Sequence, residues 1–192
     1  MNGEIARKKA DDKDRKIKIN LSAAISLFNL SAMELFKSIT TFIFDVDGVL
    51  TDGTILVLEN GVQARRMSIK DGYALQLAVK KGYHLLVISG AASSPVVDRL
   101  NKLGVTDIHM GIADKKAYVK NFIANKNLTA EQVLFMGDDM PDLGPMSIVG
   151  LPVCPADAVT EIKEIVKYIS PLNGGYGCVR DVIEKVLKLR KR

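Results

Sequence analysis

The sequence FDVDGVLTDG at residues 44–53 decides the fold prediction, because it joins an apolar run to closely spaced carboxylates. The run Thr41–Phe44 is typical of a buried strand, and Asp45, Asp47 and Gly48 follow it. Side chains at positions i and i+2 of an extended chain point the same way, so both carboxylates face one side. Gly48 then allows a sharp turn and the close approach of a ligand. We expect a strand that delivers two carboxylates to one site.

Outward from this stretch, apolar runs alternate with helical patterns. Strands are predicted at 39–44, 84–88, 105–110, 132–136 and 150–153. Helical patterns lie between them at 71–81, 94–103, 114–126 and 140–148. Strands this apolar are covered on both faces, which predicts an α/β fold with a Rossmann-like, doubly wound parallel sheet. Within 54–69, Asn60-Gly61 between two short apolar runs predicts a β-hairpin inserted after the first strand.

Polar residues follow the later strands at the points where they end. These residues are Ser89 and Gly90, then Lys115, and then Asp138, Asp139 and Asp142. The carboxyl ends of parallel strands meet at one edge of a sheet, where ligands bind in this class of fold. Carboxylates gathered there cannot all stay ionised and unpaired, which implies a hard cation. Mg²⁺ suits an all-oxygen site that shares a phosphate, and Lys116 is the alternative to Lys115 as the lysine of the site.

These residues, in this order, resemble the four motifs of the haloacid dehalogenase superfamily of phosphotransferases, over about residues 39–187. The motifs are Asp45-x-Asp47-Gly48, Ser89-Gly90, Lys115 and Gly137-Asp138-Asp139. The resemblance implies that Asp45 attacks phosphorus to form an aspartyl-phosphate, and that Asp47 acts as general acid and then base. It implies that Ser89 and Lys115 hold the phosphoryl group. The implied Mg²⁺ ligands are the Asp45 carboxylate, the Asp47 carbonyl oxygen and Asp138, supported by Asp139 and Asp142.

Within that superfamily the chain is similar to the 3-deoxy-D-manno-octulosonate 8-phosphate phosphatase family, which makes a lipopolysaccharide sugar precursor. The features that carry this are FDVDGVLTDG, the hairpin, SIKDGY at 68–73, and GGYG at 174–177 followed by Arg180. The spacing between motifs leaves no room for a cap domain. The resemblance implies a homotetramer whose hairpins pack together, with the C-terminal segment 173–180 of one subunit reaching a neighbour's site. It also implies substrate contacts from Gly48, Ser68, Lys70, Asp71, Gly72, Gly90, Arg99 and Arg180.

The sequence departs from this family at two positions that bear on the substrate. Ala91 stands where many members carry an arginine after the Ser/Thr-Gly motif, and Gln76 stands where they place another arginine. These changes affect the predicted substrate, a small sugar-acid phosphate, more than the predicted chemistry. A nine-carbon sugar acid 9-phosphate, of the acylneuraminate or deaminoneuraminate type, is therefore the alternative substrate.

Two functions without turnover are alternatives to the enzyme. A two-component receiver domain also combines a parallel sheet, an acidic Mg²⁺ pocket, a phosphorylated aspartate and a lysine. In a receiver, however, the acidic pair ends the first strand, whereas here Asp45 and Asp47 do so and the pair Asp138-Asp139 comes later. A catalytically inactive interaction module would need none of these residues. The order of the motifs therefore favours an enzyme.

The net charge of +5 does not indicate a nucleic-acid partner, because its excess lies in two tails, 1–20 and 185–192. No signal peptide or membrane-spanning run is predicted, and Cys154 and Cys178 lack metal-ligand spacing, so we expect a cytoplasmic protein. Residues 1–37 are predicted to be an extension, disordered over 1–18 and helical over 20–37. The phosphatase domain is predicted to span 38–192.

Overall fold

The computed structural model describes residues 34–190 of the chain. From Leu35 onward these residues belong to one compact unit. The disorder predicted for 1–18 and most of the helix predicted for 20–37 lie outside the described residues, and 34–38 are helical. No helix in the described range is long and apolar enough to cross a membrane.

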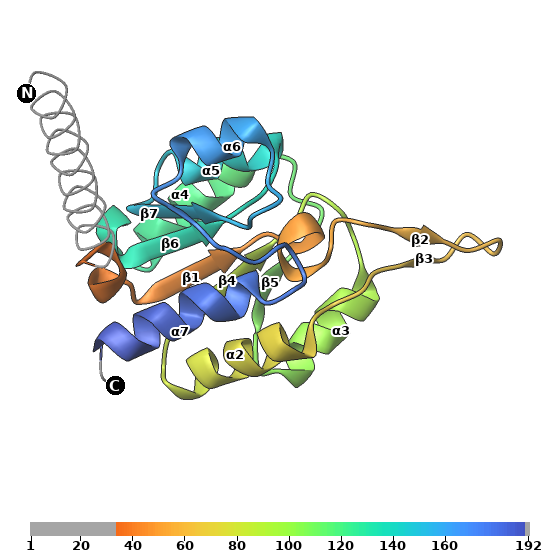
Figure 1. Ribbon diagram of the computed structural model, residues 1–192, viewed down its shortest axis with the longest axis horizontal. Helices are drawn as coiled ribbons and strands as arrows, with labels where there is room; N and C mark the ends of the chain where they lie inside the picture. The colour runs from red at the N-terminus through yellow and green to blue at the C-terminus, as the bar shows by residue number, and fades with distance from the viewer. Residues whose placement is uncertain (1–33, 191–192) are drawn as a thin grey trace, which may run out of the picture. The chain divides into compact units, whose positions relative to one another are not determined.

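A parallel sheet of six strands, in the order β5-β4-β1-β6-β7-β8, forms the centre of this unit (Figure 1). The strands are β1 (Thr41–Phe44), β4 (His84–Ile88), β5 (Asp107–His109), β6 (Val133–Met136), β7 (Leu151–Cys154) and β8 (Tyr168–Ile169). In β1, Phe44 is paired with Val87 of β4 and with Met136 of β6. The carboxyl ends of these three strands are therefore level, and the residues that follow them meet at one edge.

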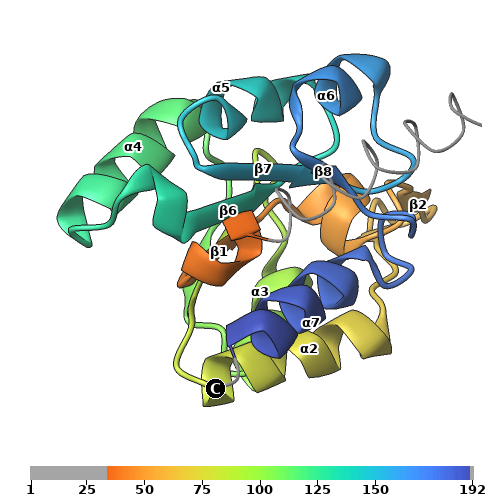
Figure 2. The ribbon, with the colours of Figure 1, turned by 60° about the vertical axis from the view of Figure 1, so that its left-hand side comes forward.

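Helices cover both faces of the sheet (Figures 1 and 2). One face carries α2 (Ile69–Lys80), α3 (Ser94–Lys102) and α7 (Cys178–Arg190); the other carries α4 (Lys115–Asn125), α5 (Leu143–Met146) and α6 (Thr160–Ile165). Each face of the sheet packs against its helices in a separate hydrophobic core. Alternate residues of β1 belong to the two cores: Phe42 and Phe44 to the first, and Ile43 to the second. The predicted doubly wound α/β fold without a cap domain is confirmed.

The predicted hairpin projects from the domain as β2 (Leu56–Val57) and β3 (Gln63–Ala64), shown on the right in Figure 1. The two strands are antiparallel, and the Asn60 side chain accepts a hydrogen bond from the Val62 N–H in the turn. An isolated bridge between Thr51 and Met67 joins the two ends of the insertion. The described residues also contain three short helical segments besides 34–38, namely η1 (Val46–Leu50), η2 (Ala130–Gln132) and η3 (Met140–Asp142).

The predicted segments differ from the structure mainly at their ends and in the C-terminal part. The strand predicted at 105–110 is shorter, and the helix predicted at 140–148 is two pieces, η3 and α5. Pro145 lacks the N–H that a continuous helix would donate to the carbonyl of residue 141, which accounts for the division. The sequence patterns did not predict β8, which contributes two partly exposed residues to the edge of the sheet.

Candidate active site

Asp45 follows β1 directly and lies at the centre of the site. Its backbone N–H donates to the Met136 carbonyl at 3.1 Å, which extends the pairing of β1 with β6 to the carboxylate itself. The residue is buried, with 5% of its surface exposed. The chain then turns through η1, where Gly48 has φ of +87°. A buried strand thus presents a nearly inaccessible carboxylate that needs compensating charge.

Lys115 supplies part of that charge. It is the first residue of α4, after Asp114, whose side chain caps the helix by accepting from the Ala117 N–H. The Lys115 ammonium donates to Asp45 Oδ1 and to Asp142 Oδ1, both at 2.7 Å. Lys115 is itself buried, whereas Lys116 is exposed. The structure therefore brings Lys115, and not its neighbour, to the carboxylates.

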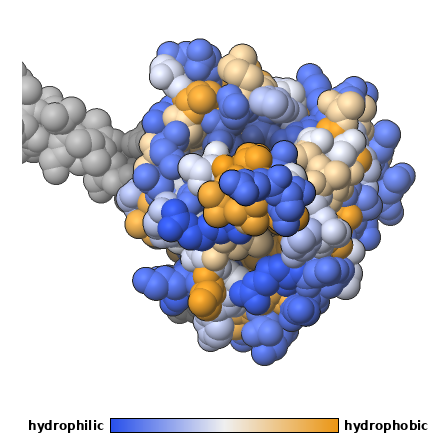
Figure 3. Space-filling view, turned by 90° about the vertical axis from the view of Figure 1, so that its right-hand side faces the viewer, coloured by the Kyte–Doolittle hydropathy of each residue, from blue (hydrophilic) through white to orange (hydrophobic). Residues whose placement is uncertain are grey.

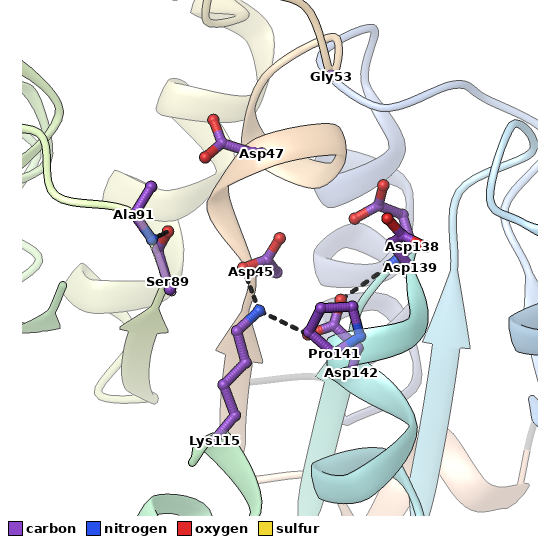
Figure 4. A pocket seen from close by; sticks show the side chains of 11 residues that line it. Asp45, Asp47, Gly53, Ser89, Ala91, Lys115, Asp138, Asp139, Pro141 and Asp142 are labelled. Carbon is purple, nitrogen blue, oxygen red and sulfur yellow. Dashed lines mark hydrogen bonds and ion pairs between the residues drawn. The ribbon is translucent and has the colours of Figure 1, made fainter. Parts of the chain in front are cut away.

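Asp138 and Asp142 complete a cluster of three carboxylates around the lysine (Figure 4). One oxygen from each of Asp45, Asp138 and Asp142 lies within 4.8 Å of the others. Asp142 uses both oxygens, because Oδ2 accepts from the Asp138 N–H at 3.1 Å and Oδ1 from Lys115. Asp138 Oδ1 is buried and has no hydrogen-bond partner among the described residues. A buried oxygen without a donor, beside other carboxylates, fits a metal ligand.

Burial and mutual repulsion raise the pKa values of these carboxyls. Burial, with Asp142 adding to it, raises the pKa of Asp45 to about 7, although Lys115 opposes the shift. Burial also raises the pKa of Asp138 to about 8, and the charges of Asp45 and Asp142 add to this. Burial favours a lower pKa for Lys115, but Asp45 and Asp142 outweigh it, so the ammonium form is held more firmly. One lysine cannot balance the negative charge of three carboxylates, so the cluster is suited to binding a cation.

A pocket of about 270 Å³ opens above this cluster. Its far wall is the loop after β4, which contributes Ser89, Gly90 and Ala91 (Figure 4). Ser89 is buried, and its Oγ accepts from the Ala91 N–H at 3.0 Å. Asp139 lies on the rim and caps η3 by accepting from the Met140 N–H. Lysine, hydroxyl and backbone groups opposite the carboxylates are suited to holding a phosphoryl group.

Asp47 lines the same pocket and forms an ion pair that the sequence reasoning missed. Arg65, one residue beyond β3, donates from Nε to Asp47 Oδ1 at 2.6 Å and from Nη2 to Oδ2 at 3.4 Å. Arg66 instead pairs with Asp52 and is exposed. Consecutive residues of an extended segment point to opposite sides, so one of two adjacent arginines had to face the domain. That was the signal in the sequence.

Four of the predicted substrate-binding residues lie at the start of α2, away from this pocket. Ser68 caps the helix by accepting from the Asp71 N–H, and Lys70 is exposed. Asp71 is buried, and its two carboxylate oxygens accept from the Gly177 and Arg180 N–H groups at 3.0 and 2.8 Å. Gly72 is also buried. This geometry gives Asp71 a role in holding the start of α7, because its oxygens are already occupied.

The two predicted arginines of the substrate site also lie outside the pocket. Arg99 lines a second cavity of about 360 Å³ between α3 and the hairpin, together with Arg65, Met67 and Pro95. Arg180 pairs with Glu184 at 2.6 Å and lies 5.9 Å from the centre of the Tyr73 ring. Within a single subunit neither guanidinium reaches the carboxylate cluster. Their contact with substrate stays a prediction.

The glycine-rich segment packs against the loop of the same chain that follows Asp45. The Gly175 N–H donates to the Val49 carbonyl at 2.9 Å. A Cβ on Gly174 would lie 1.9 Å from the Gly48 carbonyl oxygen, closer than any side chain tolerates. Segment 173–178 therefore supports the turn that carries Asp47 of its own chain. The contact of segment 173–180 with a neighbouring subunit's site stays a prediction.

Without a metal ion, the folded chain should lose stability as the pH rises from about 4 to about 8. Asp45 and Asp138 have pKa values of about 7 and about 8, against 3.8 for a free side chain. In this range the folded state keeps protons that the unfolded state has lost, so the free energy of unfolding falls with rising pH. Excess Mg²⁺ should restore the melting temperature, and more at pH 8 than at pH 5. A gain in melting temperature that is the same at both pH values would contradict this prediction. In Asp138→Asn the gain should be much smaller.

Gly48→Ala should disrupt the cluster. A Cβ at this position would lie 1.9 Å from Asp138 Oδ2, and φ is positive. Asp138 must move, so we expect phosphatase activity to fall by about 100-fold or more and Mg²⁺ to lose its stabilising effect. Gly61→Ala is the matched control, because Gly61 also has positive φ but nothing lies within 4 Å of its added Cβ. If both substitutions lowered the activity equally, backbone strain alone would account for the loss of activity.

Comparison with known proteins agrees with this geometry. Residues 100–183 match the model of the haloacid dehalogenase-like hydrolase family. The chain is 33% identical to the 3-deoxy-D-manno-octulosonate 8-phosphate phosphatase KdsC of Yersinia pestis, over 78% of this chain and 80% of that protein.

Solved structures are similar over most of the chain. The phosphatase of the same description from Moraxella catarrhalis, in complex with a magnesium ion, a phosphate ion and a KDO molecule, superposes with a TM-score of 0.81 at 29% identity. The superposition covers 84% of this chain and 92% of the Moraxella catarrhalis chain. A hydrolase of Legionella pneumophila, described as a putative member of subfamily III A of the superfamily, gives 0.85 at 28% identity, covering 88% and 93%. The chain thus belongs to the haloacid dehalogenase-like hydrolases, within the 3-deoxy-D-manno-octulosonate 8-phosphate phosphatase family, and is a phosphoric monoester hydrolase.

Proposed function

We propose that the chain is a Mg²⁺-dependent phosphatase that hydrolyses 3-deoxy-D-manno-octulosonate 8-phosphate through an aspartyl-phosphate on Asp45. Its product would be a precursor of lipopolysaccharide. The observation that carries the proposal is the buried cluster in which Lys115 bridges Asp45 and Asp142 beside the unpartnered oxygen of Asp138. The relatives that share most of the chain carry the name of this activity.

In the first half-reaction, a carboxylate oxygen of Asp45 attacks phosphorus as the bond from phosphorus to the sugar oxygen breaks. Lys115 stays 2.7 Å from Asp45 and offsets the negative charge of the phosphoryl oxygens. Ser89 and the N–H groups of its loop hold those oxygens. Asp47, protonated at this stage, gives its proton to the leaving sugar oxygen, so that a neutral hydroxyl departs.

In the second half-reaction, water attacks phosphorus and the bond between phosphorus and Asp45 breaks. Asp47, now a carboxylate, takes the proton from the attacking water and is ready for the next substrate. The residues that would hold Mg²⁺ are Asp45 and Asp138, with the Asp47 carbonyl oxygen. When bound, the ion supplies positive charge that Lys115 alone cannot provide against three carboxylates.

A panel of phosphate esters tests the substrate. The purified protein with Mg²⁺ should release phosphate from 3-deoxy-D-manno-octulosonate 8-phosphate with a kcat/KM at least about 100-fold above that for glucose 6-phosphate, since a matched polar site discriminates by several kcal/mol. Arg99→Ala should raise the KM for the sugar acid if Arg99 binds its carboxylate. Preference for hexose phosphates would overturn the proposed substrate.

A nine-carbon sugar acid 9-phosphate is the second candidate, and one observation favours it. Ala91 lines the pocket beside Ser89, so a methyl group stands where many family members carry a guanidinium. A larger sugar could occupy the space that the arginine would fill. The panel should therefore include a nine-carbon substrate, and a higher kcat/KM for it would reassign the substrate within the same chemistry. The receiver alternative no longer applies, because the family assignment is to hydrolases.

The hairpin supports a homotetramer as part of the proposal. Its apolar side chains are strongly exposed, with Leu56 at 64% and Val57 at 67%, and Ile55, Leu58 and Val62 add to the surface. Figure 3 looks onto the tip of the hairpin and shows apolar side chains gathered near the middle of this face. An apolar surface on a projecting hairpin is suited to packing against copies of itself.

Leu56→Lys combined with Val57→Lys should lower the molar mass measured by light scattering from that of a tetramer towards that of a monomer. Charges buried in an apolar contact without partners disfavour assembly. Thr54→Lys combined with Glu59→Lys is the control, because these exposed polar residues flank the apolar side chains. A wild-type protein that is monomeric at all concentrations would contradict the assembly.

A further inference from the structure

The ion pair between Arg65 and Asp47 is unusual for a pair near a protein surface. The Arg65 side chain is only 6% exposed, although it comes from a projecting hairpin, and Asp47 is 33% exposed. Both carboxylate oxygens accept from the guanidinium, at 2.6 and 3.4 Å. A two-pronged contact of this kind fixes the orientation of a carboxylate more firmly than a single contact does.

The pair also stands between two cavities. Asp47 lines the pocket above Asp45, and Arg65 lines the larger cavity between the hairpin and α3. Arg65 follows β3 directly, and the bridge from Met67 to Thr51 ties this strand to the loop that carries Asp47. The position of the Asp47 side chain therefore depends on the position of the hairpin.

We propose that Arg65 is a positioning residue that orients the Asp47 carboxyl for proton transfer and so couples the hairpin to the chemical step. The proposal rests on the proposed function of Asp47 as general acid and base. Arg65 transfers no proton itself, because a guanidinium stays charged at all pH values at which the protein is folded. Arg65 holds Oδ1 at 2.6 Å, so the proton of the acid form is carried on Oδ2, whose contact with Arg65 is the longer at 3.4 Å. This proton passes to the leaving oxygen, and Asp47 regains a proton from the attacking water.

The physical reason is that general acid catalysis depends on geometry. A carboxyl within hydrogen-bond reach of the leaving oxygen contributes about 10²- to 10⁴-fold to the rate, and a displaced one contributes little. Asp47 lies in a turn with a glycine next to it, and among the described side chains Arg65 alone donates hydrogen bonds to its carboxylate. Loss of Arg65 would leave this carboxyl free to rotate.

The test compares two esters that differ in their need for an acid. An alkyl phosphate, such as the preferred sugar phosphate, has a poor leaving group that must be protonated. The aryl ester p-nitrophenyl phosphate has a leaving group that departs as an anion. The ratio kcat/KM reports only the steps up to the departure of this group, so hydrolysis of the aspartyl-phosphate does not enter it.

Arg65→Ala should lower kcat/KM by about 100-fold for the alkyl phosphate and by less than about 5-fold for the aryl phosphate. Arg65→Lys, which keeps the charge and one contact, should recover part of the loss for the alkyl ester. Arg66→Ala is the matched control, because Arg66 is the adjacent arginine, exposed and paired with Asp52. Arg66→Ala should change kcat/KM by no more than about 2-fold for either ester.

Each other outcome contradicts the proposal in a distinct way. Equal losses for both esters would show that Arg65 shapes the phosphate pocket or the fold and does not orient the acid. No loss for either ester would show that the ion pair plays no part. If the wild-type protein released no phosphate from either ester with Mg²⁺, the proposed function itself would fail, and the Arg65 variants would not be needed to show it.

Discussion

Asp45→Asn should reduce phosphate release with Mg²⁺ to the background level, a loss of at least about 10⁴-fold, for every phosphate ester. The amide cannot act as the nucleophile, and it offers a cation one neutral oxygen in place of a charged carboxylate. The change should leave the chain folded, since Asn fits the space of Asp. It also removes a buried charge that faces Asp138 and Asp142, while Lys115 keeps Asp142 as a partner.

The measurement pairs a phosphate-release assay with a melting curve in the absence of metal. We expect Asp45→Asn to melt within a few degrees of the wild type at pH 5, because an Asp45 carboxyl with a pKa of about 7 is then largely protonated and, like Asn, uncharged. Asp98→Asn serves as the control for loss of one aspartate charge, because Asp98 is exposed on α3. Activity that survives in Asp45→Asn above the background would remove Asp45 from its proposed role.

Lys115→Ala should be the most destabilising of the site substitutions. The buried ammonium makes two 2.7 Å contacts, to Asp45 and Asp142, and its loss leaves both carboxylates without a positive partner. Removing one partner of a buried ion pair costs about 3–5 kcal/mol. We expect a fall in the free energy of unfolding of this order at pH 8 without metal, together with a loss of activity of about 10³-fold or more.

The pH dependence separates this effect from simple loss of packing. Without Lys115 the carboxyls take up protons more readily, so the destabilisation should shrink as the pH falls from about 8 to about 5. Lys116→Ala is the control, because Lys116 lies one residue on and is exposed. Urea unfolding at both pH values measures the difference. A destabilisation independent of pH, or an equal effect of Lys116→Ala, would contradict the assigned role.

Much of the fold could be predicted because its strands are short, apolar and bounded by glycine or polar residues. The strand at His84–Ile88 lies at its predicted bounds, and Thr41–Phe44 falls within the predicted range. Short, partly exposed Tyr168–Ile169 has no apolar run to mark it. Helix α7, by contrast, was not predicted, although its apolar residues have helical spacing in the sequence; Val179, Val182, Ile183 and Val186 are buried.

The site residues, like the elements of the fold, were predicted only in part. Strand order brings residues after β1 and β6 to one edge, and the structure places Asp45 and Asp138 there, together with Lys115 from the start of α4. Their catalytic roles stay predictions. The adjacent Arg65 and Arg66 indicated that one arginine faces the domain, but motif spacing did not show that its partner is Asp47, because that contact depends on where the hairpin lies. Asp71 likewise was predicted from a motif alone, while its backbone partners are Gly177, just before α7, and Arg180 within it, both more than 100 residues away.

Trapping the covalent intermediate tests the central claim most directly. Borohydride reduces an acyl phosphate to an alcohol, so quenching the enzyme during turnover should convert the phosphorylated aspartate to homoserine. We expect peptide mass spectrometry to find homoserine at Asp45 in the wild type with substrate and Mg²⁺, and to find none without substrate. Steady phosphate release with no homoserine at Asp45, or with homoserine at another aspartate, would contradict the account.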